Sequence, residues 1–147
     1  MTDSAEEPQL QIAFPPRPEY VRTVRHTVAA LARLNGVSED LVEDIKLAVS
    51  EACTNAVQIN ADLGEPERVE VRASADLDAM VIEVLDRGPD PMHAVLGSPV
   101  DLDTEDLPFD KLLSLPVIRG LVDEVAVTPR DGGGAQVRMA VSLDGPR

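Results

Sequence analysis

The chain has 147 residues, of which 44% are hydrophobic and 2% aromatic, and its formal net charge at pH 7 is -14. This length predicts a single domain with one core, which valine, leucine, isoleucine and alanine must fill because aromatic residues are so scarce. The negative charge argues against direct binding to nucleic acid or to a membrane surface, and the scarcity of rings excludes base-stacking platforms. A basic protein is the partner that this charge favours.

Cys53 is the only cysteine, so an internal disulfide is excluded. The residues before Leu10 are acidic and polar without an apolar signal segment, and no apolar run is long enough to span a bilayer. We therefore expect a cytoplasmic protein. Cys53 falls within a helical pattern, where a small buried side chain is its expected role. His26 and His93 are isolated, so no metal site made from protein residues alone is predicted.

The start of the chain predicts an arm followed by an edge strand. Residues 1–9 are acidic and polar, and we expect them to be flexible, whereas residues 10–144 form the single domain. Apolar and polar residues alternate over 10–14, which predicts a short edge strand that stops at Pro15 and Pro16.

Two helices are predicted next. The first begins near Pro18 and ends at Asn35 and Gly36, which are typical of a helix terminus. The second begins at Ser38, whose hydroxyl can cap free amides, and ends between residues 60 and 64. The apolar stripe of the first helix comprises Val21, Val24, Val28 and Leu31, and that of the second comprises Leu41, Ile45, Ala48, Ala52, Ala56 and Ile59.

Two strands and a long loop follow. The pattern predicts strands over 69–75 and 80–85, joined by a hairpin at 76–78. Glycine and two prolines force a turn after the second strand, at 86–91. A strongly acidic stretch at about 87–113 has little periodicity, so it is either a lid over a functional site or a solvated connector.

The end of the chain predicts a short helix and a final hairpin. The helix begins near Ser114 and Pro116 and continues through Val122. A strand over 125–127 and another over 137–143 flank a turn at 131–134, whose glycines precede a strand and therefore do not form a phosphate loop. The whole order of elements predicts an α/β two-layer sandwich, with helices on one face of a mixed, largely antiparallel sheet.

Three polar residues stand out against this background. Glu51 and Asn55 are four residues apart and therefore share one face of the second helix, beside a row of alanines. Asp86 ends the strand that follows the hairpin. Glu and Asn at this spacing are common on exposed helix edges, so a structural role is the alternative to a functional one.

Together these motifs give the chain a resemblance to the GHKL, or histidine kinase-like, ATPase superfamily, and within it to the anti-sigma-factor serine/threonine-protein kinases. The resemblance rests on three segments, which read EACTNAV at 51–57, DRG at 86–88 and VIRGLVDEV at 117–125. It covers nearly the whole chain and implies the Bergerat fold of that superfamily.

The resemblance assigns roles to individual residues. It implies that Asn55 holds Mg²⁺ on the phosphates of ATP and that Glu51 orients or deprotonates the attacking group. It implies that Asp86 accepts a hydrogen bond from the adenine amino group and that Gly88 lets the backbone approach the base. Ala135 occupies the position of a threonine that is common near the final strand, and is expected at the nucleotide.

The chain also departs from the family pattern. Asp90, Leu112 and Ser114 stand where family members have glycines, and Ile59 stands where many have a histidine. Pro116 also removes one backbone donor from the helix that would face the phosphates.

Three functions remain open. The first is an anti-sigma factor of transcription regulation that binds a sigma factor and phosphorylates an anti-anti-sigma factor, a STAS-domain antagonist, on Ser or Thr with Mg·ATP. The second is a degenerate regulatory module that acts by protein contact alone, with weak or no nucleotide binding. The third is a stand-alone small-molecule ATPase. The resemblance further implies a homodimer formed through the first helix and strand.

Overall fold

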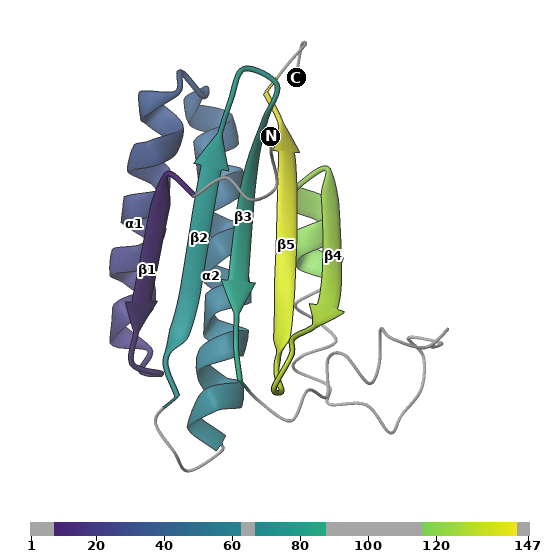
Figure 1. The fold of residues 1–147 in the computed structure, drawn as a ribbon. Coiled ribbons are helices and arrows are strands. Elements are labelled where there is room, and N and C mark those ends of the chain that lie inside the picture. The colour runs from purple at the N-terminus through teal and green to yellow at the C-terminus, as the bar shows by residue number, and fades with distance from the viewer. Residues whose placement is uncertain (1–7, 63–66, 88–115, 144–147) are drawn as a thin grey trace.

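The computed structural model of the chain describes residues 8–62, 67–87 and 116–143. It has two layers, because two long helices cover one face of a five-stranded sheet (Figure 1). In chain order the elements are β1 (Leu10–Phe14), α1 (Glu19–Leu34), α2 (Glu39–Asp62), β2 (Val69–Ala75), β3 (Ala79–Leu85), β4 (Glu124–Pro129) and β5 (Ala135–Ser142). Residues 116–121 form a further short helix. The predicted α/β two-layer sandwich is confirmed.

The sheet has the strand order β1-β2-β3-β5-β4, so β3 lies at its centre. Every neighbouring pair of the described strands is antiparallel, so the mixture of parallel and antiparallel pairs that we expected is not found among them.

The predicted hairpin between β2 and β3 is confirmed. Its Asp76 Oδ1 accepts hydrogen bonds from the amides of Asp78, at 2.8 Å, and Ala79, at 2.9 Å. The Ala79 and Asp78 amides lower the pKa of the Asp76 carboxyl.

The predicted helix boundaries are confirmed within a residue or two. Pro18 precedes α1, and Gly36, with φ of 77°, follows its last turn, where only a residue without Cβ adopts that conformation cheaply. Ser38 Oγ accepts a hydrogen bond from the Leu41 amide at 3.3 Å and so caps α2.

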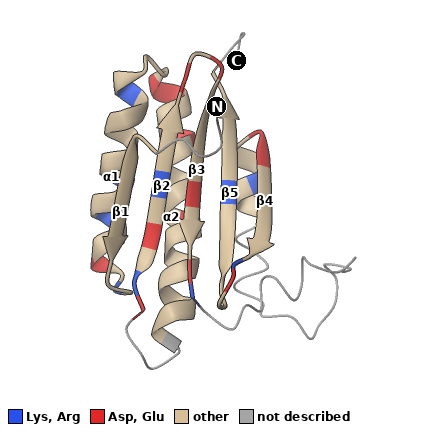
Figure 2. Cartoon of the chain, viewed as in Figure 1, with Lys and Arg blue, Asp and Glu red and all other residues tan. Residues whose placement is uncertain are grey.

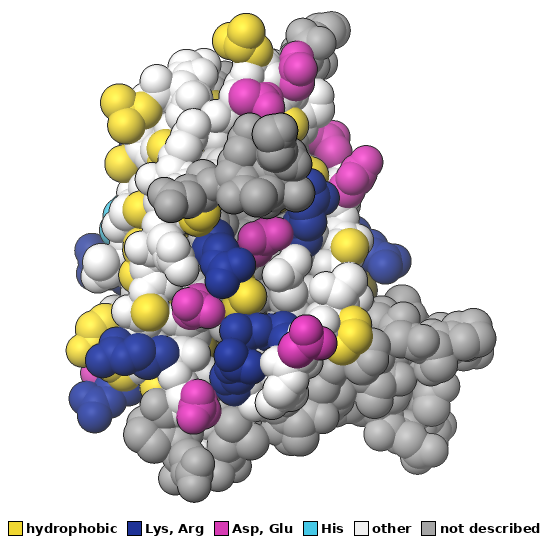
Figure 3. All heavy atoms as spheres, in the orientation of Figure 1, with side chains coloured by type: hydrophobic (Ala, Val, Ile, Leu, Met, Phe, Trp, Pro, Cys, Tyr) yellow, Lys and Arg dark blue, Asp and Glu magenta, His cyan; other side chains and the backbone are white. Residues whose placement is uncertain are grey.

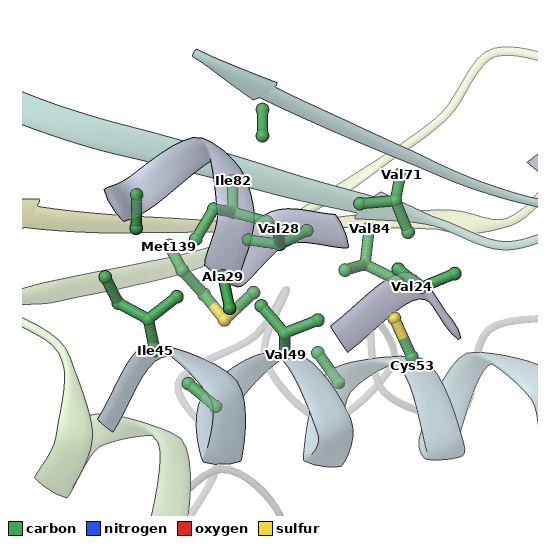
Figure 4. Packing of buried hydrophobic residues seen from close by; sticks show 14 of the residues in the cluster. Val24, Val28, Ala29, Ile45, Val49, Cys53, Val71, Ile82, Val84 and Met139 are labelled. Atoms are coloured by element: carbon green, nitrogen blue, oxygen red, sulfur yellow. The ribbon is translucent and has the colours of Figure 1, made fainter. Parts of the chain in front are cut away.

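The core lies between the helices and the inner face of the sheet, and it is built from small and branched side chains (Figure 4). Val24 and Val28 of the α1 stripe are 1% and 0% exposed, so this stripe is buried in the core of its own chain. Among the described residues, aromatic packing is limited to Phe14 and Tyr20, whose ring centroids are 6.3 Å apart. Labelled core residues in Figure 4 are Val24, Val28, Ala29, Ile45, Val49, Cys53, Val71, Ile82, Val84 and Met139.

The opposite face of the sheet is covered by none of the described helices and strands, and it carries charges of both signs. Arg72 of β2 pairs in register with Glu83 of β3, which pairs in turn with Arg138 of β5. Figure 2 shows this alternation of positive, negative and positive charge across the three strands. Opposite charges on directly paired positions stabilise a sheet, and Figure 3 shows the two signs interspersed over the same face.

Several expectations fall wholly or partly outside the described residues. These are most of the arm at 1–9, nearly all of the lid-like loop at about 87–113 and the Ser114 cap. Gln9 of the expected arm is described, and it is hydrogen bonded to the end of β2 through Ser74 Oγ and the backbone of Ala75. Within the described ranges, none of the helices combines the length and the apolar character needed to cross a membrane.

Cys53 provides a test of this core. Its side chain is fully buried, and burial raises the pKa of the thiol to about 12, so almost no thiolate forms in the folded chain at about pH 8. We expect Cys53 to react with a disulfide reagent at least roughly a hundredfold more slowly in the folded than in the denatured chain. Thiol labelling that is quenched at successive times and analysed by mass spectrometry measures both rates, and Cys53→Ser gives the background of labelling at other residues. Equal rates in folded and denatured protein would contradict the described packing.

Candidate functional site

Asn55 and Asp86 meet where α2 passes the end of β3. Both line one cavity together with Ala135, the first residue of β5. The remaining wall is apolar and consists of Ala52, Ala56, Ile59, Ile118 and Val137. The cavity has a volume of only about 10 Å³, which is no more than one water molecule needs, so its walls are nearly in contact. A nucleotide base can enter only if these walls separate.

Glu51 and Gly88 stand differently with respect to this cavity. Glu51 is half-buried and lies one helical turn before Asn55 on the same face of α2, but it is not among the residues that line the cavity. Gly88 lies outside the described residues. The structure thus brings three of the five predicted site residues, Asn55, Asp86 and Ala135, to one cavity.

Asp86 is 3% exposed and is bound to the start of β5 through both its backbone and its side chain. Its amide donates to the Ala135 carbonyl at 3.0 Å, and the Ala135 amide donates to Asp86 Oδ1 at 3.2 Å. A buried carboxylate beside an apolar wall is chemically suited to accept a hydrogen bond from an amino group of a planar base.

Two arginines join the end of β3 to the β4–β5 turn. Arg87 Nη1 donates to the carbonyls of Asp131, at 3.2 Å, and Gly133, at 3.4 Å. Arg130 Nη1 donates to the Asp86 carbonyl at 2.7 Å, and its Nη2 lies 3.4 Å from Glu70 Oε1. Burial and the neighbouring Arg87 lower the pKa of Arg130, whereas Glu70 and Asp86 act in the opposite direction. These contacts of Arg87 and Arg130 were not predicted from the sequence.

Asn60 is a further candidate for a functional role that was not predicted from the sequence. It lies near the end of α2 and is 0% exposed. Its Oδ1 accepts a hydrogen bond from the Arg87 amide at 2.9 Å, while its Nδ2 donates to the carbonyls of Glu67, at 2.8 Å, and Arg68, at 3.3 Å. Its signal in the sequence is a polar residue four positions after Ala56, where the buried face of the helix continues.

Gly134 brings the β4–β5 turn directly against Asp86. Its φ is +96°, and a Cβ added there would contact the Asp86 carbonyl oxygen and would lie 2.7 Å from the Arg87 Cα. Both atoms belong to the backbone and cannot turn away as a flexible side chain could. Position 134 therefore requires glycine for its conformation and for this close approach.

The donor set suits the two groups that the sequence resemblance implies. The Asp86 carboxylate and the apolar wall suit a purine base. The Asn55 amide oxygen suits Mg²⁺, which takes few ligands from the protein and the others from phosphates and water. Among the described residues, no group of three His, Cys, Asp or Glu side chains is placed to hold a metal ion.

Comparison with known proteins gives consistent similarities. A sequence profile described as the histidine kinase-like ATPase domain matches residues 14–141. Serine-protein kinase RsbW of Bacillus velezensis is 35% identical over 142 residues, which cover 94% of this chain and 88% of the relative. Serine-protein kinase RsbW of Bacillus subtilis is 34% identical over the same shares of both chains.

Solved structures share the fold at low identity. A chain of the SiaB–SiaC complex from Pseudomonas aeruginosa is similar with a TM-score of 0.65 and 13% identity, over 92% of this chain and 90% of that one. The mycobacterial sensor histidine kinase MprB is similar with a TM-score of 0.53 and 16% identity, over 90% and 97%. These two similarities concern the fold alone.

The contact at Gly134 can be tested by two matched substitutions. Gly133→Ala places a side chain at φ of +106° with open space around it, and we expect it to lower the free energy of unfolding by about 1 kcal/mol. Gly134→Ala meets a similar backbone cost and also the Asp86 carbonyl, so we expect a loss of about 3 kcal/mol or more. Urea titration measures both values. Equal losses would show that the close approach to Asp86 is not a constraint.

Proposed function

The chain belongs to the histidine kinase-like ATPase family, in the branch of serine-protein kinase RsbW, and we propose that it is an anti-sigma factor that phosphorylates an antagonist protein with Mg·ATP. The observation that supports this proposal is the convergence of Asn55 and Asp86 on one cavity, with Glu51 one helical turn away. The relatives are serine-protein kinases by name, which supports serine or threonine as the acceptor.

Each side chain then has a role in phosphoryl transfer. Asp86 accepts a hydrogen bond from the adenine amino group, and Asn55 holds Mg²⁺ through its amide oxygen. When bound, the metal neutralises charge on the phosphates. Glu51 accepts the proton of the Ser or Thr hydroxyl, whose oxygen forms a bond to the γ-phosphorus while the bond from that phosphorus to the leaving ADP oxygen breaks.

The proposed protein partners are a sigma factor and a STAS-domain anti-anti-sigma factor. The net charge of -14 supports a partner with a basic surface. We also propose a homodimer that pairs through α1 and β1, as the family resemblance implies. Because the apolar stripe of α1 is buried in its own chain, such a dimer must use the exposed side of α1 and the outer edge of β1.

The degenerate regulatory module is the second candidate function, and specific observations favour it. The cavity is nearly closed, and Asp90, Leu112 and Ser114 stand in place of glycines of the family. In this case the chain captures its protein partner without nucleotide.

A calorimetric titration with Mg·ATP separates the two candidates. For the kinase we expect saturable binding, weakened roughly tenfold or more by Asn55→Ala, and a loss of phosphate transfer of about a hundredfold or more in Glu51→Gln with binding retained. Gln58→Ala, an exposed position on the same helix, is the matched control.

The kinase proposal is contradicted if the unsubstituted chain neither binds Mg·ATP nor transfers phosphate to the antagonist. Tight capture of a partner by the same protein without nucleotide would then support the regulatory module. Turnover of ATP without any protein acceptor would support the small-molecule ATPase instead.

A further inference from the structure

The two buried polar side chains of the described residues, Asn60 and Asp86, are joined through one peptide unit. The unit between Asp86 and Arg87 has a carbonyl at one end and an amide at the other. The Arg87 amide donates to Asn60 Oδ1 at 2.9 Å, and the Asp86 carbonyl accepts from Arg130 Nη1 at 2.7 Å. Hydrogen bonds at both ends therefore fix the plane of this peptide unit.

Fixing that plane also sets the direction of the Asp86 side chain. The Asp86 amide donates to the Ala135 carbonyl, so the peptide units on both sides of the Asp86 Cα are held. With the two backbone dihedrals of Asp86 restricted, the carboxylate is directed toward the Ala135 amide and the cavity.

Asn60 is suited to this task because it holds three backbone groups at once. Its acceptor binds the Arg87 amide, and its donor group binds the Glu67 and Arg68 carbonyls, which lead into β2. An aliphatic residue at this buried position would remove all three of these part-buried hydrogen bonds. An aspartate would keep the acceptor but would place a negative charge against two carbonyls.

Asn60 and Asn55 lie on the same helix. The distance along α2 between them is fixed by helix geometry, so the residue that holds the Asp86 peptide is rigidly connected to the proposed metal ligand. One helix thereby sets both the phosphate end and the base end of the site.

We propose that Asn60 is a positioning residue that directs the Asp86 carboxylate and thereby sets the preference for an adenine base. The positioning of the carboxylate stands on hydrogen bonds of the chain itself, whereas the consequence for the base rests on the proposed function. Two measurements separate these parts.

The first measurement is amide hydrogen exchange by NMR without nucleotide. The Ala135 amide, which donates to Asp86 Oδ1, reports on the carboxylate, and the Met139 amide reports on the middle of β5. In Asn60→Ala we expect exchange at Ala135 to accelerate roughly tenfold more than at Met139. In Val57→Ala, a buried control on the same helix, we expect the two amides to change by the same factor.

Arg130→Met is a second variant in case Asn60→Ala does not fold. It releases the carbonyl end of the same peptide unit and also removes the ion pair with Glu70, but Arg130 is not one of the core residues, so it should accelerate exchange at Ala135 in the same selective way. If exchange at Ala135 is not selectively accelerated in the variants that fold, the positioning role is overturned, whatever the nucleotide data show.

The second measurement compares the Kd of ATP with that of inosine triphosphate, which has an oxo group in place of the adenine amino group. We expect Asn60→Ala to reduce the preference for ATP roughly tenfold, because the carboxylate no longer meets the amino group, while Val57→Ala retains the preference. An unchanged preference in Asn60→Ala overturns the role toward the base. If the unsubstituted chain binds neither nucleotide but Ala135 responds as expected, the proposed function fails and the positioning of Asp86 stands.

Discussion

The peptide unit between Asp86 and Arg87 is the point on which the candidate site depends. Asn60 of α2 accepts a hydrogen bond from the amide of this unit, and Arg130, the residue after β4, donates one to its carbonyl. The β4–β5 turn lies against the same unit at Gly134. None of these contacts is local in sequence. The site therefore exists only when α2, the central strand β3 and the final hairpin are all assembled, and its geometry is a property of the whole sheet rather than of one loop.

The two faces of the sheet differ in the residues that they carry. The inner face and the helices bury mainly valine, isoleucine, alanine and methionine, and Phe14 is the one aromatic residue among these described core residues. The outer face, which no described element covers, carries the row Arg72, Glu83 and Arg138, where neighbours attract each other. Glu70 belongs to both regions, because it pairs with Arg72 at 3.9 Å on the outer face and with Arg130 at 3.4 Å beside the site.

Most of the fold could be predicted because its signals are local. The alternation of apolar and polar residues predicted the boundaries of β2 correctly. The Ser38 hydroxyl, which can cap a helix, and the conformational freedom of Gly36 predicted two helix ends. The proximity of Asn55 and Asp86 was available only through the family resemblance. Asn60, Arg130 and Gly134 were missed because the partners that give them a role are distant in the sequence. Periodicity places Asn60 on the buried face of its helix, but it does not indicate which groups the side chain binds. The closure of the cavity depends on how Ile118 and Ile59 pack, which no motif records.

The packing of Tyr20 near Phe14 determines which part of the structure the intrinsic fluorescence of this protein reports on. The chain has no tryptophan and one tyrosine, so its intrinsic fluorescence comes from Tyr20 at the start of α1. This ring is 37% exposed and packs near Phe14, at the end of β1, rather than against the residues that line the cavity. A change in tyrosine emission therefore reports on the junction of β1 and α1. Because the chain has no tryptophan, the emission of a fluorescent purine analogue, or of a tryptophan introduced near Asp86, can be measured with little background from the protein.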